Sequence, residues 1–275
     1  MEVTLLGTGS PLPSPDRAGP ATLVRAGGAN LLFDCGRGVV MRLAAAGLVP
    51  AGLSAVLLTH LHSDHITDLN DIVTGHWLMA PEGSPLRVMG PPGTGRVLDA
   101  VLEMLALDQD YRIQHHADLN QSPALEVTEV EPGAELTVAG TTVKVYETDH
   151  RPVAPTVGYR VETDEGSVAL AGDTVPCPGL DEMCRGADIY VQTVIRADLV
   201  MAIPNRRLQD ILDYHSTVEQ AAETASRAGV GTLVLTHCVP PVAPGAEEEW
   251  KAKAAAHFAG RIILGPDLTA VTVPA

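Results

Sequence analysis

Basic residues, aromatic residues and long hydrophobic runs are all scarce in this sequence. Of its 275 residues, 18 are lysine or arginine and 34 are aspartate or glutamate, which gives a formal net charge of −16. A protein that binds nucleic acid needs basic side chains to displace counterions from the phosphates. The only lysines are Lys144, Lys251 and Lys253. The charge therefore disfavours a nucleic-acid partner.

The lack of long apolar runs, of a signal peptide and of cysteine pairs indicates where the protein is located, and the shortage of aromatic residues indicates what its core contains. No segment has the roughly 18 consecutive apolar residues that indicate a membrane-spanning helix, so we expect no membrane insertion. The stretch MEVTLLGTGS has no basic region ahead of an apolar one, and predicts a strand rather than a signal peptide. The cysteines form no CxxC pair, which is typical of reduced thiols and predicts a cytoplasmic protein. Aromatic residues make up only 3%, so the core must consist mainly of leucine, valine, isoleucine and alanine.

Patterns of strand hairpins and helices alternate in two comparable halves of the chain, with no low-complexity linker between them. Gly27-Gly28 predicts a hairpin turn between two strands. Further along, Ser216 and Glu219 have the spacing of a capping box at the start of a helix. We therefore expect one α/β domain over residues 1–275, with two β-rich halves and helices outside them.

The segment THLHSDHITDL follows directly after the apolar run LSAVLL and is rich in histidine and aspartate. His60, His62, Asp64 and His65 fit the pattern H-x-H-x-D-H. In an extended segment, residues two apart project to the same side, so His60 and His62 can face one cation. Asp64 and His65 can face a second one. Zinc binds imidazole and carboxylate groups and prefers four ligands, so each ion would need more of them. A polar surface loop is the alternative interpretation.

Further candidate ligands stand at the ends of predicted strands. VYETDH ends in His150, VALAGD ends in Asp173 and TLVLTH ends in His237. A single histidine or aspartate in such a place is usually structural. Three of them in a chain that already has the histidine cluster indicate a metal site, because strand ends meet at one edge of a sheet.

Several of these motifs, in this order, resemble those of the metallo-β-lactamase superfamily. They are THLHSDHITDL, TDHRPVAPTVGYRVE, LAGDT and DYHSTVEQAAETASRAGVGTLVLTHCVPP. The opening LLGTGSPLPSPDR and the segment LLFDCGRG are similar to the branch that contains ribonuclease Z, arylsulfatase-like and phosphodiesterase-like hydrolases. The resemblance implies a four-layer αββα sandwich with metal ions at one edge, between the two sheets.

The same resemblance implies a ligand set and a mechanism. It implies two zinc ions per chain, or manganese or iron in their place: one held by His60, His62 and His150, the other by Asp64, His65 and His237, with Asp173 bridging them. A hydroxide between the ions would be the nucleophile, because zinc lowers the pKa of bound water to about 7. Asp64 could also orient that water or accept its proton. His215 would protonate the leaving group, and a purely structural role is the alternative for this residue.

One motif is weaker than it looks. GPPGTGRV nearly spells a phosphate-binding P-loop between a strand and a helix. The required lysine is replaced by Arg96, and the metal-binding serine or threonine by Val97. We therefore expect the glycines to shape the entry of the helix, without ATP binding.

The remaining polar candidates have no settled role. His115 and His116 lie in the polar segment 109–123, which we expect to be largely loop. His76 belongs either to an apolar substrate lid or to ordinary packing. Arg206 and Arg207 could meet an anionic substrate, though a solvated loop explains them equally well.

The function we expect is hydrolysis of a small ester by a binuclear zinc site. The substrate would be a small molecule, namely a sulfate ester, phosphodiester, lactone or thioester. The resemblance also implies a homodimer. A tRNA 3′-end endoribonuclease is the first alternative. Three observations speak against it: the net charge, Ala18 where that branch has asparagine, and residues 151–172, which leave no room for a long tRNA-clamping arm. A non-catalytic metal-binding protein is the second alternative.

Overall fold

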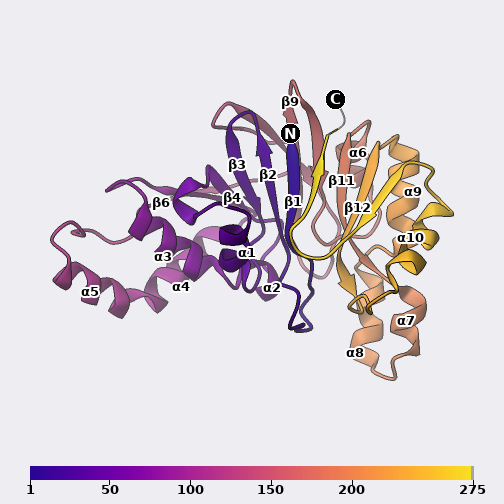
Figure 1. The fold of residues 1–275 in the computed structure, drawn as a ribbon, viewed down its shortest axis with the longest axis horizontal. Helices are drawn as coiled ribbons and strands as arrows, with labels where there is room; N and C mark the ends of the chain where they lie inside the picture. The colour runs from indigo at the N-terminus through magenta and orange to yellow at the C-terminus, as the bar shows by residue number, and fades with distance from the viewer. Residues whose placement is uncertain (274–275) are drawn as a thin grey trace.

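A computed structural model describes residues 1–273, which form two β-sheets packed face to face between layers of helices (Figure 1). The first seven-stranded sheet has the order β14 (Thr269–Thr272), β1 (Glu2–Gly7), β2 (Ala21–Ala26), β3 (Ala29–Phe33), β4 (Ala55–Leu57), β5 (Leu86–Gly90), β6 (Leu125–Glu129). The second has the order β13 (Arg261–Leu264), β12 (Thr232–Val239), β11 (Ile189–Ile195), β10 (Gly166–Leu170), β9 (Val157–Thr163), β8 (Thr141–Glu147), β7 (Glu135–Val138). This is the αββα arrangement that the sequence predicted.

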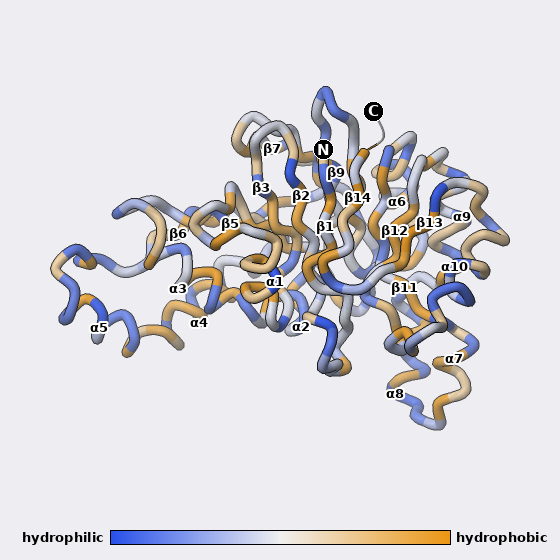
Figure 2. Tube along the Cα trace, in the orientation of Figure 1, coloured by the Kyte–Doolittle hydropathy of each residue, from blue (hydrophilic) through white to orange (hydrophobic). Residues whose placement is uncertain are grey.

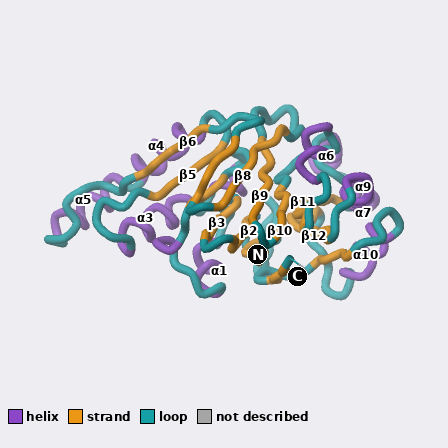
Figure 3. Tube along the Cα trace, turned by 90° about the horizontal axis from the view of Figure 1, so that it is seen from above, coloured by secondary structure: helices purple, strands orange, loops and turns teal. Residues whose placement is uncertain are grey.

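The helices lie on the outer sides of the two sheets (Figure 3). Those of the first half are α1 (Val39–Ala45), α2 (Ser63–Ile66), α3 (Leu69–Met79), α4 (Thr94–Met104) and α5 (Ala106–His115), with a short 3-10 turn, η1 (Pro50–Gly52). Those of the second half are α6 (Pro178–Cys184), α7 (Ala197–Ala202), α8 (Arg206–Gln209), α9 (Val218–Ala228) and α10 (Glu247–Ala255), with a second 3-10 turn, η2 (Asp210–Asp213). None of the helices described here is long and apolar enough to cross a membrane.

Buried hydrophobic residues form one large cluster at each interface between layers. The middle cluster joins side chains of both sheets, such as Leu31 and Val168. A second lies between the first sheet and α1, α3 and α4, and a third between the second sheet and α6, α9 and α10. Figure 2 shows the hydrophobic stretches following the strands, with hydrophilic stretches around α5 and on the outer loops. Aliphatic side chains dominate all three clusters, as the shortage of aromatic residues predicted.

A run of parallel strands in each sheet determines where the functional loops lie. Strands β3 to β6 run parallel to one another, and so do β10 to β13. The carboxyl ends of parallel strands meet at one edge of a sheet, which is where α/β proteins build binding sites. The loops after β4, β10 and β12 therefore come together.

Two local predictions were wrong. Residues 109–115 belong to α5 and are helical, not loop. The capping box of α9 is formed by Thr217 and Gln220, one residue later than expected. The reason is that the Ser216 hydroxyl is buried and donates to the carbonyl of Thr174, which leaves Thr217 to cap the helix.

The loop that resembles a P-loop already holds an anion from its own chain. The backbone N–H groups of Gly93 and Gly95 donate to Oε1 of Glu129, at 2.9 and 3.1 Å. A carboxylate at the start of a helix satisfies N–H groups that have no partner within the helix. This explains the glycines without a nucleotide.

Candidate metal centre

The histidine cluster lies in the loop after β4 and in the short helix α2. His60 and His62 stand in the extended segment, and His62 has β-region dihedrals just before α2 begins. Asp64 and His65 occupy the single turn of α2 and are buried. The turn from strand to helix thus gives the two pairs different directions, as the spacing predicted.

The other candidates come from the second sheet and meet the cluster. His150 follows β8, Asp173 follows β10, and His237 lies near the end of β12. Two sets of side chains have their ligand atoms within 4.8 Å of one another: His60, His62, His150 and Asp173 in the first, and Asp64, His65 and His237 in the second. These are the groupings that the resemblance implied.

In the first set, three imidazole nitrogens converge on one point. Nδ1 of His62 lies 3.1 Å from Nε2 of His60 and 3.3 Å from Nε2 of His150. Burial lowers the pKa of His60 well below its usual value and that of His150 to about 4, so both rings are neutral at pH 7. Neutral imidazole is the form that binds metal ions.

In the second set, a carboxylate lies between two imidazoles. Oδ2 of Asp64 is 3.2 Å from Nε2 of His237 and 3.6 Å from Nε2 of His65. Burial alone would lower the pKa of His65, because it disfavours the charged ring, but the nearby carboxylates of Asp173 and Asp34 outweigh it and raise the pKa well above its usual value. A position that favours a proton so strongly also favours a metal cation.

Asp173 lies between the two sets. Its Oδ2 is 3.8 Å from Nε2 of His60 and 3.9 Å from Nε2 of His150, on one side. On the other side it is 3.5 Å from Nε2 of His65 and 3.6 Å from Nε2 of His237. Burial would raise the pKa of this carboxyl, but the surrounding histidines lower it well below its usual value, so it stays ionised.

The buried polar atoms that lack partners fit a metal site. Among the described residues, Nε2 of His65 and Oδ1 of Asp173 are buried with no hydrogen-bond partner. Such atoms are costly to bury unless something satisfies them. Imidazole and carboxylate are the donors that zinc and related transition metals take. The residues present therefore fit two neighbouring divalent cations.

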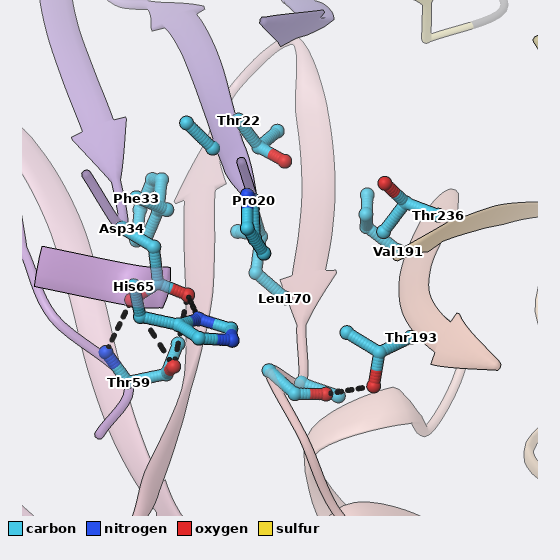
Figure 4. Close-up of a pocket in the computed structure, with 13 residues that line it drawn as sticks. Pro20, Thr22, Phe33, Asp34, Thr59, His65, Leu170, Val191, Thr193 and Thr236 are labelled. Atoms are coloured by element: carbon cyan, nitrogen blue, oxygen red, sulfur yellow. Dashed lines mark hydrogen bonds and ion pairs between the residues drawn. The ribbon is translucent and has the colours of Figure 1, made fainter. Parts of the chain in front are cut away.

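A buried carboxylate that the sequence analysis did not identify, Asp34, contacts residues of this centre (Figure 4). Asp34 accepts from Nδ1 of His65 at 2.8 Å, and from the backbone N–H and the hydroxyl of Thr59. The Thr59 hydroxyl also lies 3.0 Å from Nδ1 of His60. Asp34 thus fixes one ring of each set, one directly and one through Thr59. The signal was an aspartate in LLFDCG, at the end of an otherwise apolar strand.

His215 lies against the centre on the side of the second sheet. Its Nδ1 donates to the carbonyl of Ile211 at 2.9 Å, and its Nε2 faces Oδ2 of Asp173 at 3.2 Å. Burial lowers the pKa of His215, but the hydrogen bond and the charge of Asp173 outweigh it, so the pKa lies above its usual value. A ring that is held at Nδ1 and whose pKa is raised is suited to donate a proton from Nε2.

The other polar candidates lie elsewhere. His76 is buried in α3, between the carbonyls of Pro50 and Ser84, so it is a packing residue and not part of a lid. His115 and His116 are exposed at the end of α5. Arg206 and Arg207 begin α8, where Arg206 pairs with Asp210.

A groove of about 730 Å³ opens beside His150. Its walls are the loop 147–156, the start of α6 and the turn at residues 130–132. Proline, valine and alanine side chains alternate there with polar ones. Its size is in the range of ligand-binding sites.

Comparisons with known proteins agree on the family. The model of the Beta-lactamase superfamily domain matches residues 29–238. A ribonuclease Z from Mycolicibacterium paratuberculosis is 59% identical over 100% of this chain and 99% of its own length, and one from Mycobacterium tuberculosis H37Rv is 55% identical over 99% and 98%. Among solved structures, the metallo-beta-lactamase fold protein YhfI from Bacillus subtilis superposes with a TM-score of 0.75 at 21% identity, over 98% of both chains. Human tRNase Z, short form, gives 0.72 at 23% identity over 100% of both.

These relatives overturn the prediction of a small-molecule ester substrate and of no nucleic-acid partner. Proteins that are 55–59% identical over the whole chain bear the name Ribonuclease Z. The missing arm was a poor criterion, because these relatives align over 98–99% of their own length and leave no room for one either. Ala18 is buried and its N–H donates to Asp267, so its identity does not report on substrate contact. Net charge is a sum over the surface and says nothing about where the basic side chains lie.

The non-catalytic alternative also fails, since the chain has full-length relatives named as enzymes and keeps both ligand sets together. The ester-hydrolase prediction holds at the level of reaction type. The chain belongs to the metallo-β-lactamase superfamily and, within it, to the ribonuclease Z branch of metal-dependent hydrolases that act on ester bonds.

Proposed function

We propose that this protein is an endoribonuclease that cleaves a phosphodiester bond at the 3′ end of precursor tRNA. The observation that carries the proposal is the 55–59% identity to mycobacterial proteins named Ribonuclease Z, over nearly the full length of both chains. The human neighbour named tRNase Z supports the fold. A cytoplasmic location stays a prediction.

We propose that the two sets hold two zinc ions, with manganese or iron as substitutes. The first ion would be held by His60, His62 and His150, the second by Asp64, His65 and His237, and both by Asp173. When bound, such ions lower the pKa of water and stabilise the negative charge that develops on the phosphate. The donor set and the unpartnered atoms of His65 and Asp173 support this.

Two residues would handle protons in the reaction. Asp64 has its Oδ2 within 3.2 Å of His237 and can both hold a cation and orient the attacking water. His215, which the bond to Ile211 keeps in one orientation, would protonate the departing ribose oxygen from Nε2. General acid catalysis of this kind typically contributes 10²–10⁴-fold.

The test is cleavage of a precursor tRNA that carries a 3′ trailer, with mapping of the product ends. We expect one cut at the 3′ end of the tRNA part, loss of activity after chelation, and recovery when zinc or manganese is added. Mature tRNA without a trailer is the matched control and should stay intact. An absence of cleavage by protein that holds its metal would contradict the proposal.

A further inference from the structure

Some basic residues of this acidic protein form ion pairs with carboxylates and others do not. Most form ion pairs with acidic neighbours, as Arg25 does with Glu2 and Arg227 with Asp181. Within residues 1–273, the basic side chains that form no ion pair are Arg17, Arg37, Arg96, Arg185, Arg207 and Arg261. These are the guanidinium groups whose charge is not already compensated by a carboxylate.

In the first sheet, the topology brings unpaired arginines to the edge that carries the metal centre. Strands β3, β4 and β5 are parallel, so the residues after them lie at the same edge. Arg37 follows β3, His60 follows β4, and Arg96 follows β5 in the first turn of α4. The two arginines therefore stand on either side of the histidine loop.

In the second sheet, Arg207 reaches the same edge. It lies in α8, which follows the carboxyl end of β11 and leads through η2 to His215. By contrast, Arg185 precedes β11 and Arg261 begins β13, at the amino ends of parallel strands. These two arginines therefore lie at the opposite edge.

Close contacts place the segments just before Arg37 and Arg96 next to the histidine loop and α2. A Cβ atom on Gly36 would lie 2.4 Å from the carbonyl oxygen of Asp64, so the residue before Arg37 touches the ligand helix. A Cβ atom on Gly93 would lie 3.0 Å from Leu61, which separates His60 from His62. Figure 1 shows α2 and α8 below the lower ends of the strands, with α4 at the left beside α3 and α5.

The guanidinium groups at this edge have N–H donors that make no hydrogen bond within the described residues. Arg37 gives one N–H to the carbonyl of Ser10. Arg96 and Arg207 are exposed, and their side chains make no hydrogen bond within the described part of the chain. Of the carboxylates nearby, Asp149 pairs with Arg151, Asp210 pairs with Arg206, and Glu129 accepts from the N–H groups of Gly93 and Gly95. Asp99 and Asp213 are exposed and form no ion pair within residues 1–273.

We propose that Arg37, Arg96 and Arg207 bind phosphates of the RNA on the two sides of the scissile bond. This rests on the proposed function and says how a chain of net charge −16 holds a polyanion. Guanidinium binds phosphate in a bidentate geometry. Each phosphate that an arginine neutralises releases counterions, and this shows as a dependence of affinity on salt.

The test compares two sets of Arg→Gln variants in a His215→Ala background, in which cleavage of bound precursor tRNA is expected to be slower by roughly 10²-fold or more. One carries R37Q, R96Q and R207Q, and the other R185Q and R261Q. For the first we expect the slope of log Kd against log salt concentration to fall by roughly 2 to 3 units, since each contact contributes about 0.7–0.9. The second set should keep the slope of the parent.

Metal content and melting temperature establish that each variant is intact. Because Arg37 is half-buried, the pair R96Q and R207Q serves as a second variant and should lose roughly 1.4 to 1.8 units of slope. An unchanged slope in these variants, or an equal fall in the opposite-edge set, would overturn the inference. Failure of the parent enzyme to cleave precursor tRNA would instead overturn the proposed function, and it needs no variant to be seen.

Discussion

The hydroxyl of a single residue, Thr59, links the two candidate ligand sets. It contacts both the Asp34 carboxylate and Nδ1 of His60, while Asp34 holds His65 directly. Hydrogen bonds of this kind fix the tautomer and direction of a ligating imidazole. The sequence pointed to the candidate ligands but not to this support, because the partners are far apart in the chain and meet only in the fold.

We expect Thr59→Val to weaken metal binding by about 10–100-fold, the usual cost of losing such a partner. Valine has nearly the same shape but no hydroxyl, so His60 loses its fixed orientation. The measurement is metal affinity by competition with a chelator. Thr59→Ser keeps the hydroxyl and is the control. Equal affinities for the valine and serine variants would show that the contact to His60 has no effect.

His215→Ala should keep both metal ions and lose turnover of precursor tRNA by roughly 10²-fold or more. The ring faces Asp173 but belongs to neither of the two ligand sets, so its loss removes a proton donor and not a ligand. A phosphodiester with a nitrophenolate leaving group needs no such proton, and its hydrolysis should fall much less. Losses of the same size for both substrates would indicate that His215 positions the phosphate instead.

At the scale of elements, α9 shows what a local pattern can and cannot predict. Ser216, Thr217, Glu219 and Gln220 offer two overlapping capping boxes, and the sequence does not rank them. The structure selects Thr217 because Ser216 is used in a tertiary contact with the Thr174 carbonyl. Helix α5 was missed for a related reason, since its polar residues lack the apolar period of a helix packed on a sheet.

Thr217→Ala should lower the free energy of unfolding by about 1 kcal/mol, the typical cost of losing an N-cap side chain. Chemical denaturation of the metal-loaded protein measures this. Thr217→Ser keeps the capping oxygen and should unfold close to the parent. If the alanine and serine variants were equally stable, the cap of α9 would contribute nothing measurable.

At the scale of the whole molecule, the centre joins the two sheets. His60, His62, Asp64 and His65 come from the first sheet, and the other candidate ligands from the second. Bound metal should therefore stabilise the entire fold, by about 2.7 kcal/mol when the free ion is at 100 times its Kd. Chelation should lower the melting temperature of the parent. Asp173→Ala, which lacks the residue between the sets, should respond far less; an identical response would contradict the bridging role.

The fold and the grouping of the candidate ligands could be predicted from the sequence because both depend on local patterns and their order: apolar strand runs, and polar residues at their ends. The substrate could not, because the prediction relied on total charge. Charge becomes informative only once the side chains in ion pairs are set aside, and these pairs form between residues as distant in the sequence as Arg42 and Asp267. The basic residues that remain, such as Arg96, can be identified only in the folded chain.

The pairing of β1 with β14 has a consequence for synthesis. Residues 2–5 find their partners only at residues 269–272, so a ribosome makes nearly all of the intervening chain while β1 has an open edge. Unpaired strand edges are where other chains attach. His237, the candidate ligand that is translated last, is synthesised before β14. All candidate ligands are therefore present while the edge of β1 is still unpaired. We therefore expect protection against association with neighbouring nascent chains to be a late step, after synthesis of the last candidate ligand.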